Sequence, residues 1–155
     1  MLLALLGGVP LALEARAIQV LTYQELFTRS NLIVVATPIS ATVDTSEEYV
    51  LPGIETIHPN GTTRSVKCIG VETAFKISAV LKGDGTIRQL ILHHYRDPSG
   101  PAINGAMLVR FDGSPSSYLL FLVKEPDGRY APKGGQVDPG FNAITKLPQV
   151  DPGLR

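Results

Sequence analysis

The stretch VETAFKISAVL, residues 71–81, carries the clearest pattern in the chain and decides the fold class. Positions 71, 73, 75, 77, 79 and 81 are apolar or threonine, and they alternate with a second set that includes Glu72, Lys76 and Ser78. Side chains on a β-strand point alternately to its two faces, so this period of two predicts a half-buried strand. Upstream, Val66 and Cys68 have the opposite parity, and Gly70 lies where the register changes, which indicates a β-bulge.

On both sides of residues 71–81, turns rich in Gly and Pro separate further apolar stretches that predict strands. These stretches are residues 32–36, 88–95, 107–111, 118–123, 129–131 and 141–147. The first is expected to bend at Thr37–Pro38 and to continue, half-exposed, to Val43. Residues 44–61 are expected to form a long polar loop, in which 55–57 and 62–64 are candidates for a hairpin about the turn at 58–61. Alternation places Val34, Phe75, Ile77, Leu119, Phe121 and Ile144 in one core.

One short helix is expected before the strands. Thr22 and Glu25 have the spacing of a capping box, and Leu26 and Phe27 supply an apolar face. The helix should end near residues 30–31, where Ser and Asn follow one another.

The first 17 residues have the pattern of a signal peptide. Residues 2–13 are apolar, and Ala15 and Ala17 occupy positions −3 and −1 of a cleavage site. No basic residue precedes the apolar stretch, and the alternative is a short buried N-terminal helix. The expected organisation is a signal peptide over 1–17, a single β-barrel domain over 18–147 and a C-terminal tail over 148–155. An extracytoplasmic location, periplasmic or secreted, follows from this interpretation.

Composition excludes several classes of function. The 155 residues include 14 Lys and Arg against 14 Asp and Glu, so the chain lacks the basic excess of a nucleic-acid-binding protein. No run of 18 apolar residues occurs, and we expect no membrane span. The single cysteine, Cys68, makes no internal disulfide and is expected to be a small core residue, and the histidines lack the spacing of a metal site. We therefore expect no metal and no cofactor.

At least six strands in about 115 residues predict an all-β domain with one short N-terminal helix, either a barrel or a sandwich. A bent first strand that serves two sheets favours a small antiparallel Greek-key barrel.

The order of the segments also resembles a known group. They are residues 30–36, 75–77, 80–83 with Leu81–Lys82–Gly83, 118–122, 127–130 and 135–136. Together they resemble a loose group of secreted bacterial proteins of unknown function, whose barrels are similar to the OB-fold of tissue inhibitors of metalloproteinases and netrin modules. The resemblance covers roughly residues 22–147 and implies an OB-fold-like barrel without implying an activity. The inhibitors chelate a target zinc through an N-terminal cysteine, whereas the expected mature start here is Ile18, so that mechanism is not carried over.

The candidate ligand-binding residues are His93, His94, Tyr95 and Arg96. They are the densest group of polar-tipped rings and charge in the chain, at the end of a strand that begins as Leu90–Ile91–Leu92. Because His93 and His94 are adjacent on a strand, their side chains should point to opposite faces. We expect this strand end and the loop 44–61 to form a binding site at one end of the barrel. The competing interpretation is that the four residues only satisfy one another and the nearby backbone.

Two functions from different classes remain. The first is a non-enzymatic extracytoplasmic binding or interaction module for an unknown protein or small ligand. The second is a small metal-dependent or histidine-based hydrolase centred on His93 and His94. The sequence has no paired carboxylates, no metal motif and no nucleophile elbow, which favours the binding module.

Overall fold

The computed structural model describes residues 20–57, 61–98, 108–111, 116–135 and 142–149. Its elements are one helix and seven strands: α1 (Tyr23–Arg29), β1 (Leu32–Pro38), β2 (Val43–Ile57), β3 (Thr63–Lys82), β4 (Gln89–Arg96), β5 (Tyr118–Lys124), β6 (Tyr130–Pro132) and β7 (Ile144–Lys146). The expected signal peptide and residues 150–155 of the expected tail lie outside the described residues. Within the described ranges, α1 lacks the length and hydropathy of a membrane-spanning helix, and no other helix is present.

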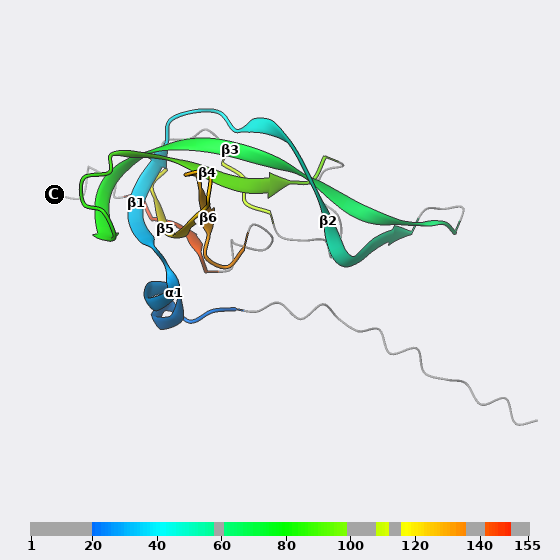
Figure 1. Ribbon diagram of the computed structural model, residues 1–155, viewed down its shortest axis with the longest axis horizontal. Coiled ribbons are helices and arrows are strands. Elements are labelled where there is room, and N and C mark those ends of the chain that lie inside the picture. The colour runs from blue at the N-terminus through cyan, green and yellow to red at the C-terminus, as the bar shows by residue number, and fades with distance from the viewer. Residues whose placement is uncertain (1–19, 58–60, 99–107, 112–115, 136–141, 150–155) are drawn as a thin grey trace, which may run out of the picture.

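Five strands close into the predicted all-β barrel, in the order β1-β3-β4-β6-β5. Closure comes from β1, which pairs with β3 along one edge and with β5 along the other. Every pairing is antiparallel except the contact between Leu92 on β4 and Tyr130 on β6. This arrangement fits a small barrel of the OB type. Figure 1 shows the closed part of the sheet with α1 beneath it.

The helix forms as predicted. Thr22 Oγ1 accepts a hydrogen bond from the Glu25 backbone at 3.2 Å, and the Glu25 carboxylate accepts one from the Thr22 backbone at 2.9 Å. These two bonds satisfy backbone donors that the first helical turn leaves without partners. Leu26, the buried residue of the helix, packs with Ile33 and Phe121 on the outside of the barrel.

The alternation predicted for residues 71–81 is correct up to Ile77. Val71, Thr73, Phe75 and Ile77 are all buried. Beyond Ile77, two register shifts in the pairing of β1 with β3 interrupt the alternation. Each extra residue in one strand of a pair inverts the parity that follows it. As a result Val80 packs against the core, whereas Leu81 is 56% exposed.

The predicted single core is wrong for β5. Leu119 and Phe121 belong to a second cluster between α1 and the barrel, while Tyr118, Leu120 and Leu122 fill the barrel with Phe75 and Ile144. The strand is covered by the barrel interior on one face and by the helix on the other. A strand that is apolar on both faces has no alternation from which its register can be predicted.

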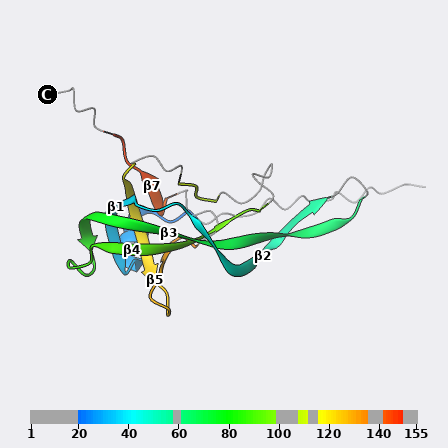
Figure 2. The same ribbon diagram turned by 90° about the horizontal axis from the view of Figure 1, so that it is seen from above.

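The expected long loop at 44–61 is also wrong, because residues 43–57 form β2. This strand pairs with β3, and the two extend beyond the barrel as a two-stranded arm (Figures 1 and 2). The hairpin predicted near the turn is present, with Glu55 opposite Ser65 and Ile57 opposite Thr63. The first strand ends at Pro38 and does not continue to Val43. Residues 108–111, predicted to be strand, are irregular, and Met107 lies outside the described residues.

Candidate functional site

The predicted site residues lie on β4, whose register with β3 separates them onto two faces. Val71 is the register partner of His94, and Glu72 is the register partner of His93. As predicted, the two adjacent histidines point in opposite directions. The His94 ring contacts Thr73 and Phe111 inside the barrel, whereas His93 contacts acidic side chains on the outer face.

A group of charged residues, which we call the rim cluster, surrounds His93. It consists of Glu47 on β2, Glu72 on β3, His93 on β4, and Glu125, Asp127 and Arg129 on the connection between β5 and β6. Its members come from four parts of the chain that are adjacent only in the folded barrel.

Arg129 is the centre of the rim cluster. Its guanidinium lies 2.8 Å from Glu47, 2.9 Å from Glu72 and 2.7 Å from Asp127, and the side chain is only 17% exposed. Burial by itself would lower the pKa of Arg129, but the hydrogen bonds to Glu47 and Glu72 raise it above its usual range. Arg129 is therefore a fixed cation that joins the arm, the barrel and the β5–β6 connection.

His93 bridges two of the same segments. Its Nδ1 lies 2.9 Å from Glu125 Oε2, its Nε2 lies 3.0 Å from Glu47 Oε2, and its side chain is 3% exposed. A neutral imidazole carries a hydrogen on only one of its nitrogens. The Nδ1–Glu125 contact has the geometry of a hydrogen bond, whereas the Nε2–Glu47 contact is an ion pair without that geometry and depends on the positive charge of the ring.

Gly70 explains how Glu47 reaches His93. The register of β2 with β3 passes from Asp44–Val71 to Glu48–Ile69, so residues 45–47 face Gly70 alone. A Cβ atom at Gly70 would lie 2.7 Å from Thr45 Oγ1 and 3.0 Å from Glu47 Cβ, so only glycine fits without displacement. The bulge that the sequence predicted at Gly70 thus lies in the opposing strand β2.

Tyr95 and Arg96 also contact β2. The Tyr95 ring stacks on Tyr49 at 5.3 Å between centroids and lies edge-on to His93 at 5.4 Å. Burial, and then the charge of Glu47, raise the pKa of Tyr95. Arg96 makes a two-point ion pair with Asp44, including a contact of 2.6 Å from Nε to Oδ1. These side chains fasten the arm to β4.

His94 belongs to the barrel interior. Its Nε2 lies 2.9 Å from Thr73 Oγ1, and that hydroxyl lies 2.8 Å from Thr42 Oγ1. Desolvation by burial, followed by the nearby charge of His93, lowers the pKa of His94 to about 4. Its neutral ring packs edge-to-face against Phe111, so His94 lies on the opposite face of β4 from His93 and Tyr95.

A groove of about 600 Å³ runs beside the rim cluster along the outer face of β3 and β4. Its floor includes Ala74 and Ile91, and its walls include Gln89, Lys124, Asp127 and Arg129. The Ile91 side chain is 44% exposed, although it lies on an internal strand. The volume falls in the range that ligand pockets commonly have.

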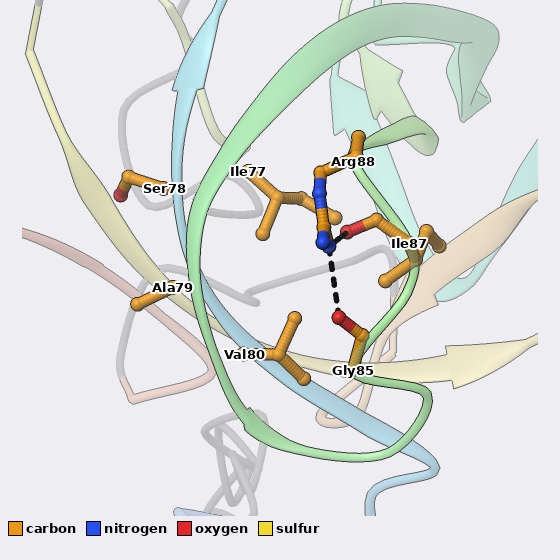
Figure 3. A pocket seen from close by; sticks show the side chains of 7 residues that line it. All are labelled: Ile77, Ser78, Ala79, Val80, Gly85, Ile87 and Arg88. Atoms are coloured by element: carbon orange, nitrogen blue, oxygen red, sulfur yellow. Dashed lines mark hydrogen bonds between the residues drawn. The ribbon is translucent and has the colours of Figure 1, made fainter.

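A second hollow, of about 440 Å³, lies inside the turn between β3 and β4 (Figure 3). Figure 3 shows Arg88 extending across this turn, where its guanidinium donates hydrogen bonds to the backbone carbonyls of Gly85 at 2.8 Å and Ile87 at 3.1 Å. Arg88 therefore braces its own turn, and we take the groove beside the rim cluster as the candidate site.

Two observations concern the potential metal-binding and thiol groups. In the described part of the chain, no set of three or more His, Cys, Asp and Glu side chains has the geometry to hold a metal ion. Cys68 is fully buried, as predicted, and desolvation followed by the charge of Asp97 raises its pKa. A raised pKa disfavours the thiolate, which is the nucleophilic form.

Sequence analysis missed most of the rim cluster. Glu47 lies in the segment expected to be a loop, and Glu125, Asp127 and Arg129 lie around a turn at Pro126–Gly128. Arg129 and Glu47 are 82 positions apart, and no local pattern connects them.

Neither the protein-family models nor the curated proteins contain a match to this chain. The protein is a closed OB-type barrel with a charged cluster and a groove on the face of β3 and β4.

Proposed function

We propose that this protein is a non-enzymatic extracytoplasmic binding module that holds a protein segment or small ligand across the outer face of β3 and β4. OB-type barrels bind on the face of their second and third strands, flanked by the loops between strands one and two and between strands four and five. Among the barrel strands here, β3 and β4 are the second and third. The arm strand β2 occupies the first flanking connection, and residues 125–129 occupy the second.

The observation that carries this proposal is the position of the groove against the rim cluster. Ile91 offers an exposed apolar surface, and Gln89 and Lys124 offer a hydrogen-bonding amide and a positive charge. Apolar walls with a few fixed polar groups are typical of ligand sites. The ion pairs of Arg129 hold one wall of the groove in a defined position.

The same geometry gives a hydrolase little support. Carboxylates face both ring nitrogens of His93, and His94 is buried with its Nε2 against Thr73. A general base needs a nitrogen that can reach the proton it removes.

The proposal is tested by placing a charge on the groove floor. The variant Ile91→Glu should fold normally, because the side chain is partly exposed, and should lose capture of the ligand that the wild type retains from host extract. The matched control is Leu81→Glu, an exposed apolar residue of β3 outside the groove, which should bind like the wild type. Identification of the captured molecule and its titration against all three proteins complete the test. Equal affinity of Ile91→Glu and the wild type would refute the proposed site.

A further inference from the structure

We propose that Glu47, His93 and Glu125 form a pH-operated clasp. Charged His93 holds the β2 bulge and the β5–β6 connection together beside the groove, and neutral His93 loosens the bulge. The link to ligand access rests on the proposed function, whereas the clasp itself is a property of the free protein.

The contacts of His93 with the two carboxylates depend on the positive charge of the ring. Glu47 and Glu125 approach opposite nitrogens of one ring, at 3.0 Å and 2.9 Å. When the ring loses its charge, one carboxylate faces a nitrogen lone pair and is repelled. When His93 is neutral, at least one of its two carboxylate contacts must therefore change.

Of these two contacts, the one between Glu47 and His93 breaks more easily. Both oxygens of Glu125 lie within 3.1 Å of Nδ1, whereas Glu47 makes a single charge contact with Nε2. The Glu47 side chain is 43% exposed and that of Glu125 is 22% exposed, so water can replace the ring more easily at Glu47. Glu47 is the side that opens.

Other charged and titratable groups surround the His93 ring. Glu47 faces it from β2, Glu72 and the Tyr95 phenol lie next to it on β3 and β4, and His94 is its neighbour on the opposite face of β4. The β5–β6 connection contributes Glu125, Asp127 and Arg129. With His93 neutral, Arg129 alone balances the four carboxylates of the rim cluster. Their mutual repulsion then acts in the same direction as the lost contact.

The bulge of β2 can move without a movement of the barrel. Residues 45–47 lie between two ladder pairings and have no register partner of their own on β3. Besides the contact with His93, the described contacts of the bulge include the bond from the Thr45 hydroxyl to the Gly70 carbonyl at 3.0 Å, the bond from the Glu47 amide to Thr45 Oγ1 at 3.1 Å and the Glu47–Arg129 pair. Short segments with few ladder bonds open at low free-energy cost.

Nuclear magnetic resonance of the full chain without any ligand tests the clasp. The ring nitrogen shifts of His93 report its protonation, and amide exchange at residues 45–48, corrected for intrinsic chemical exchange, reports the bulge. Over the pH interval in which these nitrogen shifts change, protection of the amides of residues 45–48 should fall about tenfold or more as His93 loses its charge. Amides in the centre of β5 serve as an internal control and should not change.

Two variants separate the clasp from a general effect of pH. The glutamine of Glu47→Gln can donate to or accept from neutral His93, so protection in this variant should not follow the pH. His93→Gln removes the titrating group and should also give a flat profile. Wild-type protection that stays constant while His93 titrates would overturn the proposal, as would a His93→Gln variant that keeps the wild-type profile. Because no ligand is used, this result is independent of the Ile91→Glu experiment.

Discussion

At the scale of single residues, Gly70 determines whether the rim cluster can form. The bulge of β2 lies directly over this glycine, and the missing side chain leaves room for Thr45, Glu47 and the His93 ring. The contacts of Glu47 with His93 and Arg129 depend on that close approach.

We therefore expect Gly70→Ala to destabilise the protein by about 1–3 kcal/mol, the usual cost of forcing atoms into a packed site. It should also abolish the pH response of residues 45–48. Chemical denaturation measures the first effect and amide exchange the second. Gly85→Ala is the matched control, because nothing lies within 4 Å of its added Cβ, and its stability should change by about 0.5 kcal/mol or less. Equal effects of the two substitutions would contradict this packing.

His94 gives a second prediction at the residue scale, on stability against pH. Its folded-state pKa of about 4 lies below the ordinary 6.5 because the ring is buried. The unfolded chain therefore takes up the proton first, so stability falls as the pH drops from about 6.5 to about 4 and changes no further below that range. The shift corresponds to about 3 kcal/mol.

In His94→Gln the side-chain amide can still bond to Thr73, but it does not titrate. Subtracting the stability profile of the variant from that of the wild type removes the contribution of the other titrating groups. Urea denaturation of both proteins at a series of pH values gives this difference. A difference profile that is flat from pH 7 to pH 4 would show that the buried His94 ring does not cause this loss of stability.

At the scale of elements, β5 shows why a strand's register cannot always be predicted. Leu119 and Leu120 are both leucines in an uninterrupted apolar run, and only the folded molecule assigns one to the helix side and the other to the barrel interior. Leu120 is fully buried, whereas Leu119 is partly buried at the edge of its cluster.

This assignment predicts unequal costs for two identical substitutions. Leu120→Ala should lower the free energy of unfolding by about 2–5 kcal/mol, since it leaves a cavity in the closed barrel. Leu119→Ala should cost roughly half as much or less, since water and neighbouring side chains can fill the space. Guanidinium denaturation of the two variants compares them directly. A larger loss for Leu119→Ala would mean that the register of β5 is inverted.

At the scale of the whole molecule, Arg129 links three parts of the fold, namely the arm, the barrel and the β5–β6 connection. Its ion pairs reach the arm through Glu47, the barrel through Glu72 and its own connection through Asp127. Removing the guanidinium would leave these carboxylates close together without a counter-charge.

We expect Arg129→Ala to cost about 2–3 kcal/mol, in the range of hydrogen bonds to charged groups in a partly buried setting. Arg88→Ala is the control, because that guanidinium bonds to carbonyls of its own turn, and its cost should be about 0.5 kcal/mol. Thermal and chemical denaturation measure both. If the two arginines cost the same, Arg129 does not join the three parts as described.

Features that depend on neighbours along the chain could be predicted from the amino-acid sequence. The capping box at Thr22 and Glu25 forms because its bonds span only three residues, and the strand about Phe75 forms because one face is buried and the other is not. The all-β class and the opposite orientation of His93 and His94 follow from the same alternation.

The rim cluster, in contrast, depends on contacts between distant parts of the chain. The polar composition of β2 predicted a loop, but the arm is a strand that keeps its polar residues because much of it is exposed. Glu47 and Glu125 meet His93, and Arg129 meets both carboxylates, only in the folded barrel, where β2 and β4 pair with opposite edges of β3. Charge pairs between such distant positions leave no periodic signal, because their geometry is set by sheet closure and by the space above Gly70 and not by spacing along the chain.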